Sequence, residues 1–521
     1  MRPGSLVGLI LLASAAAFGA QQPLHELGGQ VTVQWKNALR TSDTTPTTQY
    51  LANALTVPGN SLNRPLLDDL RALHTNDTRL QLWFSVPLQA VPELKEPSAI
   101  RTYWDFTHID PVVKSFFANT EGKRHVNIGT IPRWMFRVPT VALPTDPAAS
   151  FYGYTRGTNG DLLKDPTGQQ FAEYQARIFR WYTQGGFTDE LGKYHHSGYH
   201  FKIDYWGVMN ESVFENHLTV EQYTRLYDAV VEAIRKIDPH VEFFGPEVVG
   251  AQNVIPWARY FLNHKNHSPG VPISWFSLHN YVVAKNDPND WQSKYFTGSL
   301  FPKSFGATAA GFVDLLHQVI QLRHQLSPAT RIAIDELGTF DIPQQASGGS
   351  PASANPAGTS DPYSAYNPLY WVASGANWAA NFVTAERLGI PLISMTQMVG
   401  APTQSESCSM INWDTAVPNA HYRVLQLINS NFGPGDTLVA TRSTSSDLWA
   451  QASITAHGRR ILLINTSNKA ISLRLPAGLG TNALKLTTVD ETSGEQSPRT
   501  TSVSGDQIAL APFAVAVVAN Q

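Results

Sequence analysis

The chain has 521 residues with 38 basic and 41 acidic side chains, which gives a formal net charge of −3. This near-neutral balance gives no electrostatic reason to expect nucleic acid or an anionic membrane as a partner. A chain of this length buries enough apolar surface to fold without disulfides, and its single cysteine, Cys408, cannot form one internally. The 13 Trp and 18 Tyr residues supply flat rings that suit both core packing and sugar binding.

Residues 1–20 have the pattern of a secretory signal peptide. Arg2 gives a short cationic start, residues 6–12 are apolar, and small residues fill positions 13–20. The apolar run is shorter than the roughly 20 residues that a membrane-spanning helix needs. We therefore expect cleavage near residues 17–20 and a mature protein that is secreted or periplasmic, without a membrane anchor.

Residues 21–433 alternate strand-like apolar runs with helical patterns. Residues 220–237 have apolar positions spaced three and four apart, with Thr219 as a plausible N-cap, and 311–326 and 369–388 read the same way. Eight strands alternating with helices predict an α/β fold, a parallel (β/α)₈ TIM barrel, in which the first strand has the weakest pattern. The strand candidates are residues 30–35, 79–84, 126–131, 202–208, 241–244, 273–278, 331–334 and 392–396.

The pattern changes near residue 434. Short strand-like runs separated by turn residues, such as those around His457 and Asn465, continue to the C-terminus. Residues 434–521 therefore predict a C-terminal antiparallel β-sandwich that serves as an accessory domain. As an alternative to the barrel, part of residues 22–40 joins this sheet.

Connection lengths differ between the two ends of the predicted barrel. Links from a helix to the next strand are short, whereas the strand-to-helix links at 85–104, 137–167, 280–306 and 341–367 are long. In a barrel the latter all lie on the C-terminal face, where active sites are found. The Gly- and Ser-rich segment 341–367 predicts either a lid or a passive insertion, and Tyr363 and Tyr366 offer aromatic faces near its end.

Two of the predicted barrel strands end in glutamate. One runs to Asn210-Glu211 and the other to Asp335-Glu336. Carboxylates are costly to bury unpaired, so two of them at the active face predict a pair that hydrolyses glycosidic bonds. Asn210 precedes Glu211, where an amide would bind the sugar 2-hydroxyl, and this favours Glu211 as the acid/base. Because strand side chains alternate, only one of Asp335 and Glu336 should face the pocket, and we favour Glu336.

These motifs resemble those of clan A glycoside hydrolases, and most closely family 39, which is of the β-xylosidase and α-L-iduronidase type. Trp206 to Glu211 is similar to the family's Trp-x-x-x-Asn-Glu, and Gly245-Pro246 ends the fifth strand as in family 39. Residues 275–281 look like the sixth-strand motif, and Asp335-Glu336 looks like the seventh-strand nucleophile motif. The resemblance covers roughly residues 100–430 and implies that Glu336 is the nucleophile of a retaining mechanism.

The chain departs from family 39 at two places. Ser212 stands where family members often carry proline, and the second strand ends Trp83-Phe-Ser85 without a His-Gly pair. The resemblance to the clan is therefore stronger than the resemblance to family 39. It does not specify the sugar, the linkage or whether cleavage is internal or terminal.

Other residues are candidates for substrate binding. The period-two rule places His279 and Tyr281 on one side of their strand, where the resemblance implies contact with the nucleophile or the sugar. The alternative is an ordinary polar pair at the barrel end. Trp134 follows the third strand and either stacks on a sugar or caps the barrel, while Gln397 and Trp413 follow the eighth strand.

No metal or other cofactor is expected. Residues 195–200, His-His-Ser-Gly-Tyr-His, resemble a metal-binding tract, but they precede the fourth strand and so belong to the opposite face of the barrel. The expected partner is a carbohydrate, and the sequence carries no signal for an oligomeric state. Two alternatives to a hydrolase use the same barrel: a carbohydrate-binding protein without catalysis, and a transglycosylase that differs only in its acceptor.

Overall fold

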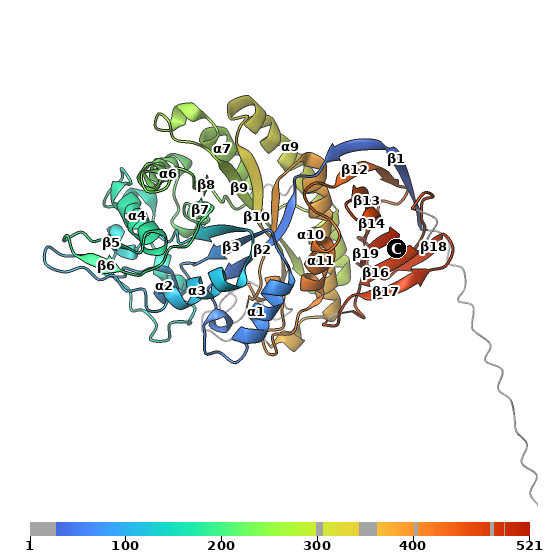
Figure 1. Ribbon diagram of the computed structural model, residues 1–521, viewed down its shortest axis with the longest axis horizontal. Helices are drawn as coiled ribbons and strands as arrows, with labels where there is room; N and C mark the ends of the chain where they lie inside the picture. The colour runs from blue at the N-terminus through green and yellow to red at the C-terminus, as the bar shows by residue number, and fades with distance from the viewer. Residues whose placement is uncertain are drawn as a thin grey trace, which may run out of the picture.

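The computed structural model describes residues 28–297, 306–342, 362–400, 405–479, 484–493 and 495–520. The expected signal peptide and residues 343–361 of the long connection lie outside the described residues. Figure 1 shows a barrel surrounded by helices beside a largely antiparallel sheet, with α10 (Pro368–Leu388) and α11 (Ala420–Asn429) between them.

Eight parallel strands form the barrel, in the order β8-β7-β4-β3-β2-β11-β10-β9. A bridge between Val248, just after β8, and Leu278 in β9 brings the two ends of this order together. The predicted (β/α)₈ architecture is confirmed. The strands are β2 (Thr45–Leu51), β3 (Asp77–Gln81), β4 (Lys123–Asn127), β7 (Tyr205–Gly207), β8 (Glu242–Phe244), β9 (Trp275–Lys285), β10 (Arg331–Ile342) and β11 (Leu392–Met395).

One long helix follows each barrel strand. The predicted N-cap of α6 is present: the Thr219 hydroxyl accepts from Gln222 N at 3.3 Å, and Gln222 Oε1 accepts from Thr219 N at 3.0 Å. The helices are α1 (Asn63–Ala72), α3 (Asp110–Asn119), α4 (Gln169–Thr183), α6 (Val220–Arg235), α7 (Ala251–Phe261), α9 (Ala309–Leu326), α10 and α11, with shorter elements α2 (Pro87–Ala90), α5 (Ser212–Glu215), α8 (Pro288–Trp291), β5 (Gly186–Thr188) and β6 (Tyr194–His196).

The predicted first barrel strand is wrong. Residues 30–35 lie in β1 (Gly29–Thr41), which pairs with the C-terminal sheet, and the first barrel strand is β2. The first residues of β1 alternate between buried and exposed, as expected for a sheet with one solvated face, whereas six of the seven β2 residues are buried. Barrel strands are covered on both faces, but the threonines of β2 gave that segment a polar pattern.

The second sheet has nine strands in the order β17-β16-β19-β14-β13-β12-β1-β15-β18. Its strands from both ends of this order share one apolar core that includes Val31, Leu463, Leu486 and Leu510, so the sheet folds over as a sandwich. The predicted C-terminal sandwich is thus confirmed, with β1 as an N-terminal addition. Its other strands are β12 (Thr437–Ser443), β13 (Leu448–Thr455), β14 (Gly458–Asn465), β15 (Ile471–Arg474), β16 (Leu484–Val489), β17 (Arg499–Val503), β18 (Gln507–Leu510) and β19 (Val515–Asn520).

The helix α10 joins the two sheets. It contacts β10 and β11 of the barrel on one side and β13, β14 and β19 on the other. Every residue from Tyr370 to Glu386 is buried, which explains why the helix is apolar all round instead of amphipathic.

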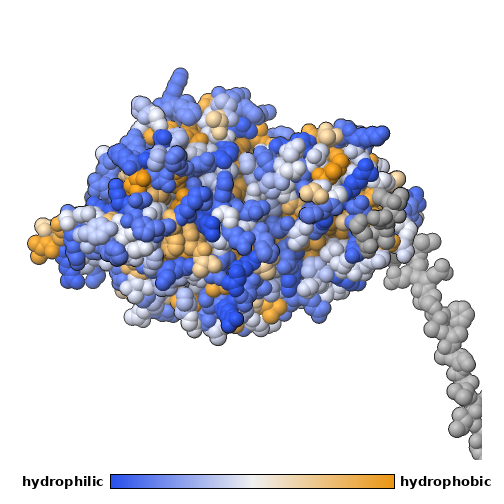
Figure 2. Space-filling model, in the orientation of Figure 1, coloured by the Kyte–Doolittle hydropathy of each residue, from blue (hydrophilic) through white to orange (hydrophobic). Residues whose placement is uncertain are grey.

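The visible surface is mostly hydrophilic, with small separate hydrophobic areas (Figure 2). Within the described residues no helix is long and apolar enough to cross a membrane.

Candidate active site

Glu211 lies at a sharp turn between β7 and α5. Met209 has φ 62° and Glu211 has φ 39°, a left-handed conformation that is uncommon for residues other than glycine. Such strained backbone positions cluster at functional sites, where the surrounding structure fixes them. Glu211 is 5% exposed, and its Oε1 accepts a hydrogen bond from His279 Nδ1 at 2.7 Å.

Glu336 lies in β10 beside a bulge. Ile334 pairs with Leu278 and Glu336 pairs with His279, so Asp335 is an extra residue in the ladder. The expectation that strand alternation would turn Asp335 away from the site is therefore wrong. Both carboxyl groups approach the same imidazole: Asp335 Oδ1 is 3.4 Å from His279 Nε2, and Glu336 Oε2 is 3.4 Å from His279 Nδ1.

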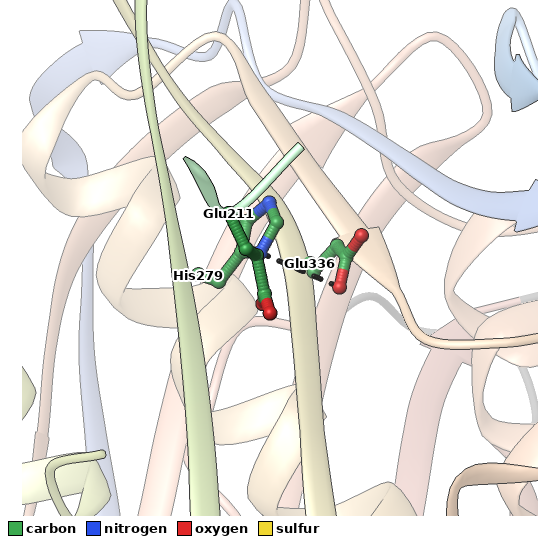
Figure 3. Close-up of side chains that lie close together, drawn as sticks. All are labelled: Glu211, His279 and Glu336. Carbon is green, nitrogen blue, oxygen red and sulfur yellow. Dashed lines mark hydrogen bonds and ion pairs between the residues drawn. The ribbon is translucent and has the colours of Figure 1, made fainter. Parts of the chain in front are cut away.

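His279 lies between the two glutamates (Figure 3). A carboxyl oxygen of Glu211, a ring nitrogen of His279 and a carboxyl oxygen of Glu336 all lie within 4.8 Å of one another. A carboxyl oxygen from the turn after β7 and another from β10 therefore lie close enough to act on one bond in a bound molecule. Tyr281, two residues after His279, donates its hydroxyl to Glu336 Oε2 at 2.5 Å.

The two carboxyl groups differ in their electrostatic surroundings. Burial raises the pKa of Glu211, and the negative charge of Glu336 adds to this effect against the lowering influence of His279. Burial also opposes ionisation of Glu336, but the positive charges of His279 and Arg79 outweigh it, so the pKa of Glu336 is lowered. For His279, burial is outweighed by Glu336 and Asp335, which raise its pKa well above the usual value. Compared with free side chains, the surroundings thus favour the protonated form of Glu211, the ionised form of Glu336 and the cationic form of His279.

Beneath the pair lies Arg79, a buried arginine from β3. Its guanidinium forms ion pairs with Glu336 and Glu247, and its Nη2 donates to Asn210 Oδ1 at 2.7 Å. Glu247 is fully buried with φ 50°, and Asn127 Nδ2 donates to both its oxygens at 2.9 and 2.8 Å. Burial raises the pKa of Glu247 to about 8, against the lowering effect of Arg79.

The structure brings together Asn210, Glu211, His279, Tyr281 and Glu336 from the residues predicted for the site. Two other candidates make different contacts. Trp134 is half-buried in a short 3₁₀ helix and donates its indole N–H to Glu93 O at 2.7 Å. The Gln397 side chain is buried next to β11, and its backbone N–H donates to Cys408 O at 2.9 Å.

The aromatic residues near the end of the long connection pack against each other. Tyr363 stacks on Trp371 with ring centroids 5.1 Å apart, and Tyr366 is buried beside Trp371 and Trp413. Their rings serve this cluster, so the expectation that they present open faces to a sugar is wrong.

Two groups of side chains have the spacing of metal ligands. Glu211, His279 and Glu336 form one, and Glu247, His279 and Asp335 form the other. Both depend on His279, whose Nδ1 lies 2.7 Å from Glu211 Oε1 and whose Nε2 lies 3.4 Å from Asp335 Oδ1, so both ring nitrogens already contact carboxyl oxygens. In the His195–His200 tract, His195 Nε2 pairs with Asp189 Oδ2 at 2.8 Å within the β5–β6 hairpin, as a structural polar contact would.

Sequence reasoning did not identify Arg79, Glu247, Glu215 or Trp83 as parts of the site. A signal for Arg79 was present, because it is the one arginine of the predicted strand 79–84, and a buried arginine needs charged partners. Glu247 comes two residues after Gly245, just beyond β8 and at the active face of the barrel. Like Glu211 and Glu336, it is a glutamate that follows an apolar run, so the same sequence criterion applied to it.

Sequence and structure comparisons show which proteins the chain is similar to. The profile of glycosyl hydrolases family 39 matches residues 184–297, and that of the D-apionate lactonase C-terminal immunoglobulin-like domain matches residues 446–518. A beta-xylosidase from Geobacillus stearothermophilus is 20% identical over 190 residues, 36% of this chain and 33% of that protein. The chain thus matches about a third of the length of this relative.

Solved structures share the whole fold. The GH51 alpha-L-arabinofuranosidase from Thermotoga petrophila RKU-1 has a TM-score of 0.58 at 15% identity, covering 94% of this chain and 99% of that one. A glucosidase from Croceicoccus marinus has a TM-score of 0.58 at 14% identity, covering 95% and 99%. By profile match and fold, the chain is similar to clan A glycoside hydrolases. The similarity to family 39 covers the segment that contains Glu211.

Proposed function

We propose that the protein is a secreted glycosidase that retains the anomeric configuration of its substrate. Glu336 attacks the anomeric carbon while Glu211 protonates the leaving oxygen, which forms a covalent glycosyl ester. Glu211 then acts as a base and activates the water that hydrolyses the ester. Tyr281 and Arg79 hold the carboxylate of Glu336 by hydrogen bonds.

The observation that carries this proposal is the short separation of two carboxyl groups with opposite pKa shifts. Retaining enzymes place their carboxyls about 5–5.5 Å apart, whereas inverting enzymes leave about 6.5–9.5 Å for a water molecule. One oxygen of Glu211 and one of Glu336 lie at most 4.8 Å apart, and this short distance supports the retaining geometry. A protein that only bound sugars would not need one protonated and one ionised carboxyl at this distance.

The similarity to a beta-xylosidase and to an alpha-L-arabinofuranosidase guides the choice of substrates to test. Activity should first be measured with aryl xylosides and arabinosides, and then with glucosides and glucuronides. Export is part of the proposal because of the N-terminal pattern in residues 1–20. N-terminal sequencing of the exported protein should find a chain that begins near residues 18–21.

Replacing Glu211 with alanine tests the acid/base role. Glu211→Ala should reduce turnover of alkyl glycosides by about 10²- to 10⁴-fold, while activated aryl glycosides, which need little protonation, form the glycosyl ester nearly normally. Azide should then restore turnover and give a glycosyl azide of retained configuration, detected by NMR. Equal losses on both substrate types without rescue, or an inverted product, would contradict the assignment.

Replacing His279 with glutamine tests the electrostatics. The imidazolium lowers the pKa of both Glu211 and Glu336, and Asp335 on its far side partly offsets its charge. Without it both carboxyl pKa values rise. Activity needs Glu336 ionised and Glu211 protonated, so both limbs of the kcat/KM profile should move to higher pH, by about one unit or more.

His267 provides a matched control for this experiment. It is also buried and pairs with a carboxylate, Asp228 Oδ1, at 2.7 Å. It lies next to α6 and α7, outside the site. His267→Gln should lower the melting temperature without moving either limb of the profile. Unmoved limbs in His279→Gln would show that His279 does not set the two pKa values.

A further inference from the structure

The Asn210 amide is hydrogen-bonded on both sides. Its Oδ1 accepts from Arg79 Nη2 at 2.7 Å, and its Nδ2 donates to Glu215 Oε1 at 2.7 Å. Arginine has only donors, and the Glu215 oxygen acts here as an acceptor, so the partners specify which end of the amide faces which way. An amide nitrogen has two hydrogens. Glu215 takes one of them and leaves the other for a ligand.

Glu215 is itself fixed by a second element. The Trp83 indole N–H, from the segment after β3, donates to the same Oε1. The backbone N–H of Glu215 donates to Glu211 O at 2.8 Å, which ties the short helix α5 to the acid/base residue. Trp83 packs edge-on against Phe84 and Tyr152, with ring centroids 4.8 and 5.8 Å apart.

The Glu215 carboxyl group is suited to this place. It is 4% exposed, and burial raises the pKa of Glu215 well above its usual range, although the hydrogen bonds from Asn210 and Trp83 act in the opposite direction. A neutral carboxyl group still accepts both hydrogen bonds through its carbonyl oxygen. In either protonation state, therefore, Glu215 Oε1 accepts from both the Asn210 amide and the Trp83 indole.

We infer that Glu215 is a positioning residue for sugar recognition: with Trp83 behind it, it orients the Asn210 amide to donate to the hydroxyl next to the anomeric carbon. This inference rests on the proposed glycosidase function. The 2-hydroxyl contact strengthens in the transition state of glycoside cleavage, so an amide that is free to reorient should reduce kcat more than it raises KM.

The test compares Glu215→Leu with the wild type on two matched substrates. These are the aryl glycoside that the wild type hydrolyses fastest and its 2-deoxy counterpart. Leucine leaves the Asn210 and Trp83 donors unpaired, so kcat/KM on the 2-hydroxy substrate should fall about 10- to 100-fold. On the 2-deoxy substrate, which lacks the hydroxyl that Asn210 binds, the loss should stay below about 3-fold.

Three further variants separate positioning from folding. Glu215→Gln keeps a carbonyl acceptor and should recover most of the activity lost in Glu215→Leu. Trp83→Phe removes only the indole donor and should give a partial loss with the same substrate dependence. Glu386→Leu removes another buried carboxyl, in α10 and 1% exposed, and should lower the melting temperature without changing the ratio between the two substrates.

Equal losses on both substrates in Glu215→Leu, or a glutamine variant as impaired as the leucine variant, would overturn the role of Glu215 while leaving the glycosidase function intact. If Glu215→Leu does not fold, the Trp83→Phe variant provides the test. The inference is overturned if this variant has the wild-type ratio of kcat/KM between the 2-hydroxy and 2-deoxy substrates. A wild type without turnover on any glycoside would contradict the proposed function, and this inference with it.

Discussion

Glu336→Gln should reduce kcat by about 10⁴-fold or more on every substrate, activated aryl glycosides included. In the proposed mechanism Glu336 forms the bond to the anomeric carbon, and an amide cannot replace it as a nucleophile. Glutamine has nearly the same shape, but Arg79 donates to Oε1 and Tyr281 to Oε2, so its one side-chain oxygen keeps only one of these two hydrogen bonds. The melting temperature should therefore fall while the protein still folds, whereas turnover should be lost.

Asp335→Asn is the matched comparison. Asp335 is fully buried next to Glu336, approaches His279 Nε2 at 3.4 Å and pairs with Arg79 Nε at 4.0 Å, so its loss should act through these two neighbours. We expect a fall in kcat of about 10- to 100-fold, well short of that in Glu336→Gln. A reversed order, with Asp335→Asn the more damaging change, would move the nucleophile to Asp335.

The second large effect concerns stability. Arg79→Met should lower the free energy of unfolding by about 3–5 kcal/mol, because it leaves ionised carboxyls buried without their main cation. The Arg79 side chain is 2% exposed, and its ion-pair partners Glu247, Asp335 and Glu336 are 0%, 0% and 7% exposed. Since the remaining carboxyls relieve the imbalance by protonation, the difference from the wild type should shrink as the pH falls. Chemical denaturation at pH 8 and pH 5 measures both effects.

Lys164→Met provides the surface control. Lys164 Nζ lies 2.7 Å from Glu96 Oε2, but the side chains are 33% and 53% exposed. Exposed pairs contribute about 0–1 kcal/mol, so this variant should unfold nearly as the wild type does. A loss in Arg79→Met no larger than in Lys164→Met would show that Arg79 is not the main counter-charge of the buried carboxyls.

The barrel could be predicted because most of its strands are short apolar runs at regular intervals between helices. The exception is instructive: β2 contains Thr47, Thr48 and Gln49, which are buried polar groups. Hydrophobicity alone therefore favoured the more apolar β1 segment. Apolar and polar residues alternate in the first part of β1, which indicates a sheet with one exposed face and so distinguishes β1 from a barrel strand.

Glu211 and Glu336 could be proposed as a pair because each follows an apolar run of the sequence at the predicted active face. The structure places Glu211 in the turn after β7 and Glu336 inside β10. The network beneath this pair could not be predicted, because ion pairs such as Arg79 with Glu247 join residues 168 positions apart, and only the closed barrel brings them together. Alternation failed at Asp335 for a local reason. The bulge in β10 turns both carboxyl groups towards His279, and nothing in the residue pattern marked its position.

The most direct test of the central claim is covalent trapping of the nucleophile. The enzyme is incubated with an activated 2-fluoro glycoside of its preferred sugar, which slows hydrolysis of the glycosyl ester, and the labelled peptide is then sequenced by mass spectrometry. The account predicts one sugar per chain, attached to Glu336, and no labelling in Glu336→Gln. A label on Asp335, or rapid turnover of the wild type without any covalent adduct, would contradict it.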